Sequence, residues 1–361
     1  MFAQQAGLPP ANFDELSAQA ETARAADRID DALGLYRRAL SIRPDWPEGW
    51  WNLATLLYDR DQFADAAVAF DKVTTLSPKA GSAWVMLGLC DYRLGRNDAA
   101  LQHIQKGRDL GTVADPQFKN VMLYHEGLLL ILKEDFEKAQ ETLALLAHDG
   151  IGSDDLRIAL GLSVLRLSPT ALSPGDSELR QVVLRAGHAE ELAAQEKFAD
   201  ASHEYEHLLA DFPKQLNVYY AYARFLMASG DPNPEKAVAA FQKEIENYPQ
   251  HVLARLAIAS LRASYDPGGG LRYAEEAVQL NPRLPMGHYL LGLLLLRTNQ
   301  TERTIQELEV ARKMMPDDAR VYYALGRAYA RADRKKDAEE AWAVFQRLKQ
   351  QSQQVSVAST K

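Results

Sequence analysis

The segment that decides the fold runs from Pro47 to Pro78 and reads PEGWWNLATLLYDRDQFADAAVAFDKVTTLSP. Its apolar residues recur at steps of three and four, first at Trp50, Leu53, Ala54 and Leu57, then at Ala66 and Phe70. Such steps place side chains along one face of a helix. Polar residues at 59–62 separate the two runs, and Pro78 ends the second one. The segment therefore predicts two amphipathic helices joined by a tight turn, which cannot bury their apolar stripes alone.

The same two-helix unit returns along the chain with a period of 34 residues. This spacing separates Pro44 from Pro78, and Pro282 from Pro316. Further copies carry Tyr322, Leu325, Gly326, Tyr329, Ala338 and Trp342, and also Leu291, Gly292, Leu308, Ala311 and Pro316. The period and the pattern resemble those of the tetratricopeptide repeat family. The resemblance implies an all-α, right-handed superhelical solenoid of stacked helix-turn-helix repeats.

One stretch interrupts the repeats, because residues 168–175 read SPTALSPG. Two prolines and a glycine exclude a regular helix there, so we expect a missing or one-turn second helix. The sequence thus predicts an irregular joint at 168–175 between an N-terminal array at 12–167 and a C-terminal array at 176–348. These arrays would hold about four and a half and about five repeats. We also expect a flexible lead at 1–11 and a disordered polar tail at 349–361.

The charge balance disfavours one class of partner. The chain has 41 basic and 49 acidic residues and a net charge of −8, which argues against a protein that binds nucleic acid through its phosphates. The single cysteine, Cys90, cannot form an internal disulfide, and we expect it to be a small buried side chain.

The chain also lacks a run of 18 apolar residues, so we expect no membrane insertion. Its first ten residues do not combine a basic region with a long apolar run, as a signal peptide would. A soluble, cytoplasmic protein is the default expectation. A periplasmic or exported protein is the alternative, if an export signal has been removed.

One short sequence, His203-Glu204-Tyr205-Glu206-His207, matches the zinc peptidase pattern H-E-x-x-H. On a helix both imidazoles could reach one metal while the glutamate activates water. However, Tyr205 occupies the core aromatic position of its repeat, so the two histidines should face outward. The longer form of the motif also fails, because Ala210 and Pro213 stand where glycine and histidine belong. We expect a solvated helix face with no metal, and a zinc metallopeptidase is the alternative.

In tetratricopeptide proteins the first helix of each repeat lines the concave face. If this chain is similar, the residue after each large core residue points into that groove. These residues are Trp51, Val85, Tyr124, Tyr220, Tyr289 and Tyr323, followed one turn later by Thr55, Leu89, Leu128, Arg224, Leu293 and Arg327. The aromatic residues would either bind a partner or fill gaps between neighbouring first helices.

The resemblance also narrows the function. Family members that bind chaperone tails grip a C-terminal carboxylate with Lys and Asn, but Ser17, Glu21, Trp51 and Thr55 stand at those positions here. Relatives that transfer sugars carry a catalytic domain after the repeats, whereas only the polar tail follows Leu348. We therefore expect no enzyme and no cofactor. The expected function is a non-catalytic scaffold that binds a partner protein or an extended peptide in the concave groove.

Charge differs between the two ends of the predicted groove. The early first helices carry Asp14, Glu21, Glu48 and Asp59, and the late ones carry Arg224, Arg255, Arg262, Arg297, Arg320, Arg327 and Arg331. Arginine binds carboxylates with two parallel hydrogen bonds, and tyrosine provides rigid contact area. We therefore predict that an acidic, partly apolar segment of a partner docks on repeats seven to ten; a solvated basic face is the alternative. The predicted partner-binding residues are Trp51, Tyr124, Tyr220, Arg224, Tyr289, Tyr323, Arg327 and Arg331.

Overall fold

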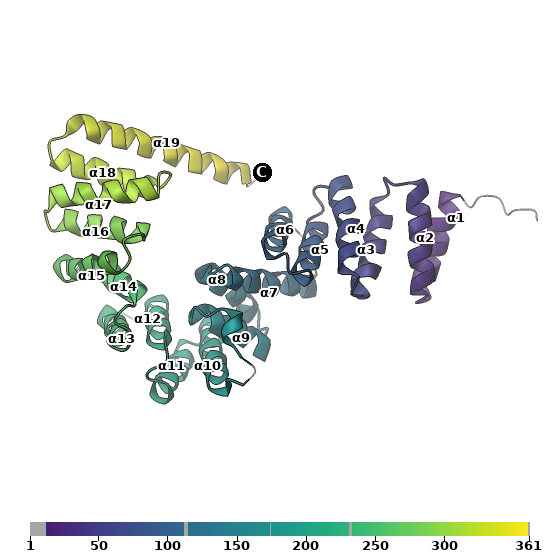
Figure 1. The fold of residues 1–361 in the computed structure, drawn as a ribbon, viewed down its shortest axis with the longest axis horizontal. Helices are drawn as coiled ribbons and strands as arrows, with labels where there is room; N and C mark the ends of the chain where they lie inside the picture. Colours follow the sequence, from purple (N-terminus) through teal and green to yellow (C-terminus); the bar gives the residue numbers. More distant parts are fainter. Residues whose placement is uncertain (1–11, 112–114, 174, 231–232, 360–361) are drawn as a thin grey trace, which may run out of the picture. The chain divides into compact units, whose positions relative to one another are not determined.

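The computed structural model describes residues 12–111, 115–173, 175–230 and 233–359. Every secondary-structure element in these ranges is a helix, which confirms the all-α repeat fold predicted from the period of the sequence (Figure 1). Contacts divide the chain into two compact units, one that ends at Lys197 and one that begins at Phe198. The lead predicted for residues 1–11 lies outside the described residues.

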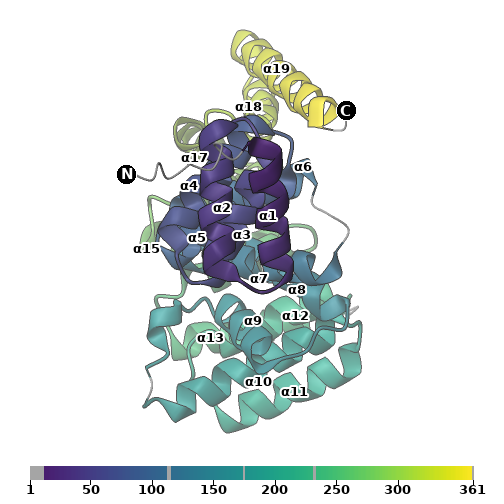
Figure 2. The same cartoon turned by 90° about the vertical axis from the view of Figure 1, so that its right-hand side faces the viewer.

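The N-terminal unit is a stack of helix pairs, in which each pair also packs against the next. Its first pair, α1 and α2, lies side by side in both Figure 1 and Figure 2. The helices of this unit are α1 (Phe13–Ala25), α2 (Ile29–Ile42), α3 (Pro47–Asp59), α4 (Phe63–Leu76), α5 (Gly81–Arg93), α6 (Asn97–Leu110), α7 (Pro116–Leu132), α8 (Phe136–His148), α9 (Asp154–Val164), the 3₁₀ helix η1 (Pro169–Ala171) and α10 (Ser177–Ala194).

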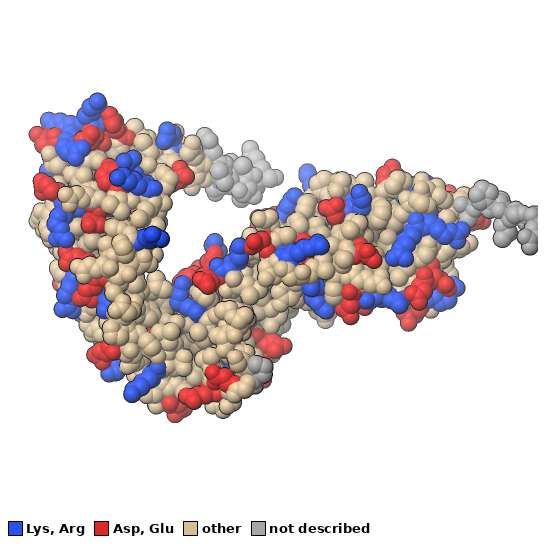
Figure 3. Space-filling model, viewed as in Figure 1, with Lys and Arg blue, Asp and Glu red and all other residues tan. Residues whose placement is uncertain are grey.

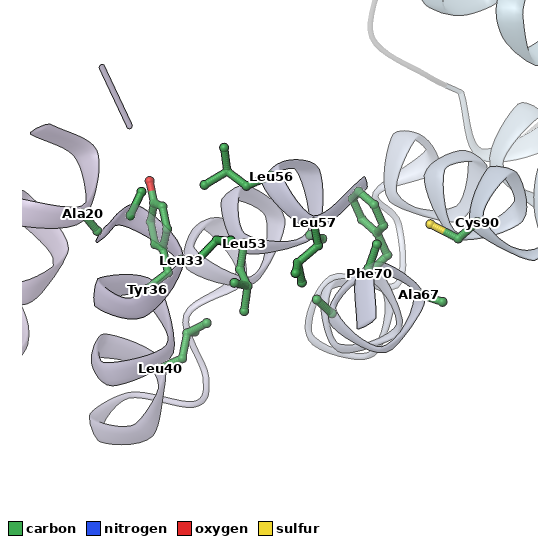
Figure 4. Packing of buried hydrophobic residues seen from close by; sticks show 14 of the residues in the cluster. Ala20, Leu33, Tyr36, Leu40, Leu53, Leu56, Leu57, Ala67, Phe70 and Cys90 are labelled. Carbon is green, nitrogen blue, oxygen red and sulfur yellow. The ribbon is translucent and has the colours of Figure 1, made fainter. Parts of the chain in front are cut away.

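The apolar stripes of these helices meet in a continuous core. Tyr36 of α2 and Phe70 of α4 are fully buried within the cluster that Figure 4 shows. Cys90 of α5 belongs to the same cluster and is buried, as expected from its apolar surroundings. Burial raises the pKa of the Cys90 thiol to about 12, so the thiol stays protonated at neutral pH.

Four repeats share a contact that explains why a large residue recurs six positions after a proline. The ring at this position, which we call the proline-bound ring, hydrogen-bonds the proline carbonyl just before its helix. The pairs are Trp50 with Pro44 at 2.8 Å, Trp84 with Pro78 at 2.9 Å, His288 with Pro282 at 3.0 Å and Tyr322 with Pro316 at 2.8 Å. Each bond satisfies a carbonyl in the loop that separates two repeats.

At the interruption, the chain forms only the short helix η1 where a second helix was expected to be missing or one turn long. Helix α10 then packs on α9 and α8 and covers the face of α9 that a second helix would cover. The division between the compact units falls after α10, at Lys197. The two arrays predicted at 12–167 and 176–348 remain a prediction.

The helices of the C-terminal unit are α11 (Phe198–Asp211), α12 (Val218–Ala228), α13 (Pro234–Asn247), α14 (Val252–Arg262), α15 (Pro267–Leu280), α16 (Pro285–Arg297), α17 (Thr301–Met314), α18 (Ala319–Arg331) and α19 (Lys335–Ser359). The unit begins with α11, which packs lightly on α12, and continues with four helix pairs, α12 with α13, α14 with α15, α16 with α17 and α18 with α19. Helix α19 continues to Ser359, so most of the segment 349–361 is helical, where the sequence led us to expect a disordered tail. Within the described ranges, no helix is both long enough and apolar enough to cross a lipid bilayer.

Candidate functional site

Two of the predicted groove aromatics, Trp51 and Tyr124, lie in the N-terminal unit, and both are half-buried. The Trp51 ring on α3 packs edge-on against Phe70, with 5.4 Å between ring centroids. The Tyr124 ring on α7 packs edge-on against His125 at 5.7 Å, and burial raises the pKa of Tyr124. Both rings therefore serve packing within their own unit and offer only part of their surface to a partner.

Tyr220 lies inside the C-terminal unit and does not line an open surface. Only 6% of the residue is exposed. Its ring lies 5.6 Å from that of Phe241 on α13 and 5.1 Å from that of His251 before α14. Tyr220 thus follows the gap-filling interpretation, because it fills the space where α12, α13 and the start of α14 meet. Arg224, one turn later on α12, is half-buried.

The most open part of the predicted surface is a stripe on α18. Arg320, Tyr323, Arg327 and Arg331 follow one another at helical steps, and all four are exposed. The opposite face of α18 buries Val321, Leu325 and Ala328 against its neighbours. The helix is therefore strongly amphipathic and presents one aromatic and three cationic side chains away from the core.

Tyr289 occupies the same register position on α16 as Tyr323 on α18, but the two rings differ in exposure. Tyr289 is half-buried, packs against the core of the last two repeats and has the Arg320 guanidinium 5.6 Å from its ring centroid. Tyr323 is 48% exposed and contacts the ring of Phe345 at 5.3 Å. Within the described chain no first helix follows α18, so nothing there covers Tyr323 as α18 covers Tyr289.

Arg331 has a structural contact in addition to its exposed position. Its Nη1 donates to the backbone carbonyl of Leu296 at 2.6 Å and to Asn299 Oδ1 at 3.1 Å. Arg297, one repeat earlier, donates in the same way to the carbonyl of Ala263. These arginines therefore cap the C-terminal end of the preceding first helix, where backbone carbonyls lack helical partners.

Several other cations of the late first helices are neutralised within the unit. Arg255 is buried and pairs with Glu276 at 2.9 Å, and Arg262 pairs with Glu235 at 3.3 Å. Arg320 pairs with Asp318 at 2.6 Å. On the face seen in Figure 3, acidic and basic side chains are accordingly interspersed. Arg327 has no ion pair or hydrogen bond to another described residue, which leaves its guanidinium available to a ligand.

A cavity of about 700 Å³ adjoins this stripe, between the loop before α18 and the second half of α19. Arg320 lines it on one side, and Phe345, Leu348 and Lys349 line it on the other. Sequence reasoning missed Phe345, because it considered only first helices as groove residues, and it missed Lys349, because it ended the last repeat at Leu348. The signal was present: Ala338, Ala341, Phe345 and Leu348 continue the helical spacing up to the point where a tail was expected.

The acidic residues predicted for the early end of the groove have mixed roles. Asp14, Glu48 and Asp59 are exposed. Glu21 accepts hydrogen bonds from the Tyr36 hydroxyl at 2.6 Å and from Asn52 Nδ2 at 2.8 Å. Burial disfavours its charged form, but the bonds from Tyr36 and Arg24 outweigh this effect and lower the pKa of Glu21. Glu21 therefore links α1, α2 and α3 rather than serving as a free surface charge.

The H-E-x-x-H sequence lies on α11 in the register that the repeats predict. Tyr205 is fully buried, and His203 and His207 are exposed with their ring centroids 4.1 Å apart. Among the described residues, no three His, Cys, Asp or Glu side chains come together in a way that could hold a metal ion. The described residues around His203 and His207 thus offer no third ligand of the kind that a catalytic zinc requires.

Comparison with known families identifies the class of protein. The model of the tetratricopeptide repeat matches residues 17–78, 52–114, 187–252 and 289–355, together more than half of the chain. The chain therefore belongs to the tetratricopeptide repeat family. This agrees with the resemblance seen in the 34-residue period and with the helix pairs of both units.

Two curated proteins are similar in sequence. A co-chaperone of heat-shock protein cognate from Aspergillus fumigatus, sgt12, is 33% identical over 103 residues, which cover 28% of this chain and 30% of that protein. The CTR9 homolog of Arabidopsis thaliana is 26% identical over 314 residues, which cover 85% of this chain and 26% of that protein. The chain thus matches less than a third of the length of either relative.

Comparison with solved structures finds matches at low sequence identity. MamA of Desulfovibrio magneticus RS-1 is 20% identical, with a TM-score of 0.44 over 50% of this chain and 98% of that one. Yeast Tom70 is 16% identical, with a TM-score of 0.37 over 93% of this chain and 69% of that one.

Proposed function

We propose that this chain is a non-catalytic scaffold whose C-terminal unit binds an acidic, partly apolar segment of a partner protein. The proposed site consists of Tyr323 and Arg327 on α18 with Phe345 and Lys349 on α19, and we call it the C-terminal face. The observation that carries the proposal is the exposed ring of Tyr323. It lies one helical turn before the unpaired guanidinium of Arg327, and it contacts Phe345, which lines the 700 Å³ cavity. Membership of a family of interaction repeats supports the same class of function.

The chemistry of the C-terminal face favours a ligand with carboxylates beside apolar side chains. Arg327 can bind a carboxylate bidentately, and Lys349 adds a second cation 6.0 Å from the Phe345 ring centroid. Tyr323 and Phe345 provide aromatic area of the kind that contributes most to protein interfaces. Arg331 is left out of the binding role, because its guanidinium already holds the end of α16.

The test uses two fluorescently labelled peptides: one alternates glutamate with leucine and phenylalanine, and the other has lysine in place of each glutamate. Binding to the full chain is measured by fluorescence anisotropy at several salt concentrations. We expect the acidic peptide to bind, and Tyr323→Ala and Arg327→Glu each to weaken it about tenfold or more. Arg327→Glu should also reduce the salt dependence.

The matched control is Lys313→Glu, which reverses an exposed cation on α17 outside the C-terminal face. It should leave the affinity within about twofold, since it changes net charge without touching the site. If Lys313→Glu and Arg327→Glu lowered the affinity for the acidic peptide equally, the attraction would be a general effect of net charge. Equal affinity for the acidic and the lysine-containing peptide would exclude an acidic ligand.

A further inference from the structure

A second cavity, of about 390 Å³, lies in the N-terminal unit between α2 and α4, with α3 as its floor. We call it the N-terminal socket. Its lining is mostly apolar and comes from Leu40, Trp50, Leu53, Leu57, Val68 and Ala69. The second helices α2 and α4 form its mouth, so it is separate from the first-helix positions predicted to line the groove and from the C-terminal face.

The rim of the socket carries two opposite charges that the described structure does not use. Arg37 on α2 and Asp65 on α4 are both exposed, and neither has an ion pair or hydrogen bond to another described residue. Val68, beside them, is 61% exposed. The mouth of the socket therefore combines free hydrogen-bonding groups with an uncovered apolar wall.

The next repeat shows how the chain fills the same space by itself. Counting 34 residues on, Trp84 replaces Trp50, Asp91 replaces Leu57 and His103 replaces Ala69. The His103 ring lies on Trp84 with 5.5 Å between centroids, and its Nδ1 is 2.9 Å from Asp91 Oδ2. Lys106 Nζ lies 3.4 Å from the centroid of the Trp84 ring. The space above this proline-bound ring is thus occupied by an internal side chain with its own polar partner.

Two later repeats follow the same rule. Above His288 the equivalent residue is Glu307, which contacts His288 Nδ1 at 2.7 Å. Above Tyr322 it is Ala341, and there a cavity of about 280 Å³ opens. That cavity has Glu309, Arg312, Asp337 and Glu340 in its walls. A cavity is therefore present where the equivalent residue is alanine, at Ala69 and at Ala341. Of these two cavities, the N-terminal socket is the one with a mostly apolar lining.

We propose that the N-terminal socket binds one large apolar side chain, of the size of leucine, methionine or phenylalanine, carried by a partner protein. Leu57 stands where Asp91 stands in the filled repeat, so the floor offers no partner to a polar group, and a buried polar group without a partner is costly. The volume lies within the range of roughly 300–1,000 Å³ found for ligand pockets. Arg37 and Asp65 then hydrogen-bond the polar atoms that flank the inserted side chain.

The direct test titrates N-acetyl-phenylalaninamide and N-acetyl-leucinamide into the full chain and follows the tryptophan indole N–H signals by NMR. The Trp50 signal should shift saturably, with a dissociation constant on the order of 1 mM for so small a probe. The Trp84 signal is an internal control and should not shift, because His103 already covers that ring. N-acetyl-asparaginamide, which is polar, should leave both signals unchanged.

Variants then locate the site. Leu57→Asp combined with Ala69→His builds the pair of the filled repeat into the socket and should abolish the saturable Trp50 shift. Ala69→Met fills the socket with an apolar side chain and should do the same without lowering Tm, so it decides the question if the double variant does not fold. The proposal is overturned if Trp50 does not respond, if Trp84 or the polar amide responds equally, or if the shift survives in Ala69→Met. None of these results depends on Tyr323 or Arg327.

Discussion

Arg331 in the last turn of α18 donates a hydrogen bond to the backbone carbonyl of Leu296 in the last turn of α16, at 2.6 Å. Carbonyls at the end of a helix have no partner within that helix and carry the negative end of the helix dipole. A guanidinium from the next first helix both donates a hydrogen bond to such a carbonyl and places a positive charge at the negative end of the dipole. Arg297 repeats the contact with Ala263 one repeat earlier, so the stripe that looks like a binding surface also joins successive repeats.

This contact predicts that Arg331 and Arg327 differ in their effect on stability. Arg331→Ala should lower the free energy of unfolding by about 1–2 kcal/mol, because a charged hydrogen bond to a helix end is lost. Arg327→Ala should change it by no more than about 0.5 kcal/mol, as is usual for exposed positions. Urea unfolding followed by circular dichroism measures both. Equal stability of the two variants would contradict the capping role of Arg331.

A buried carboxylate predicts a larger effect at the start of α12. Glu244 on α13 is fully buried and accepts hydrogen bonds from the backbone N–H groups of Asn217 at 2.8 Å and Tyr220 at 3.2 Å. Glu244→Ala should cost about 3 kcal/mol or more, since it removes the acceptor from buried donors. Glu246→Ala, on the same helix but exposed, is the control and should cost no more than about 0.5 kcal/mol. A loss below about 1 kcal/mol for Glu244→Ala would mean that other groups hold the start of α12.

Two glycines should respond to alanine with opposite signs. Gly95, in the turn between α5 and α6, has φ +73°, whereas the equivalent residues Asp27 and Asp61 reach φ 56° and 58° with side chains. Gly95→Ala should lower the free energy of unfolding by about 1 kcal/mol, because alanine disfavours this conformation. Gly34→Ala, in the middle of α2 with open space for a methyl group, should raise it by about 0.5–1 kcal/mol. Thermal unfolding of both variants checks the signs, and the same sign for both would refute the argument from backbone conformation.

The 34-residue register predicted the core well, because core positions depend on the local helix pair. It placed Tyr205 at a core position, and Tyr205 is fully buried. The exposure of individual side chains on the first helices could not be predicted from the 34-residue register. Tyr220, Tyr289 and Tyr323 share one register position but range from buried to exposed, because each depends on the helix that follows. The spacing of residues in the sequence does not show how the following helix packs against each tyrosine.

The sequence shows which first helices carry arginines, but it does not show which of these arginines are free to bind a partner. The arginines at 255, 262, 320 and 331 all have internal partners, and two of the acceptors, the carbonyls of Leu296 and His251, belong to the backbone and leave no mark in the sequence. The N-terminal socket, in contrast, was within reach of sequence reasoning. Aligning Ala69 with His103 at the 34-residue spacing already shows that one repeat lacks a side chain that the next one has.

The segment between α9 and α10 provides a test of the proposed joint. Within residues 168–173 the backbone is held by the short helix η1 and by bonds such as Ala171 N–H to the Ser168 carbonyl at 2.9 Å. We expect amide hydrogen exchange in this segment to be much faster than in the middle of α9 and α10, because it lacks a continuous helical ladder. Exchange as slow as in the two helices would show that 168–175 is a fixed part of the stack.

The last prediction concerns acid. The hydrogen bonds from Arg320 lower the pKa of Asp318, and the bonds from Arg312 and Tyr329, after overcoming the effect of burial, lower the pKa of Glu309. A carboxyl whose pKa is lower in the folded state contributes stability that is present above its unfolded pKa of about 4 and is lost as pH falls further. The free energy of unfolding should therefore decrease below about pH 5. Asp318 also accepts from the backbone N–H of Arg320 at 2.9 Å at the start of α18, and asparagine caps helices equally well. Asp318→Asn should thus keep the cap while it flattens part of the acid-dependent decrease, measured by urea unfolding between pH 7 and about pH 3. An unchanged pH profile in this variant would place the acid sensitivity on other carboxyl groups.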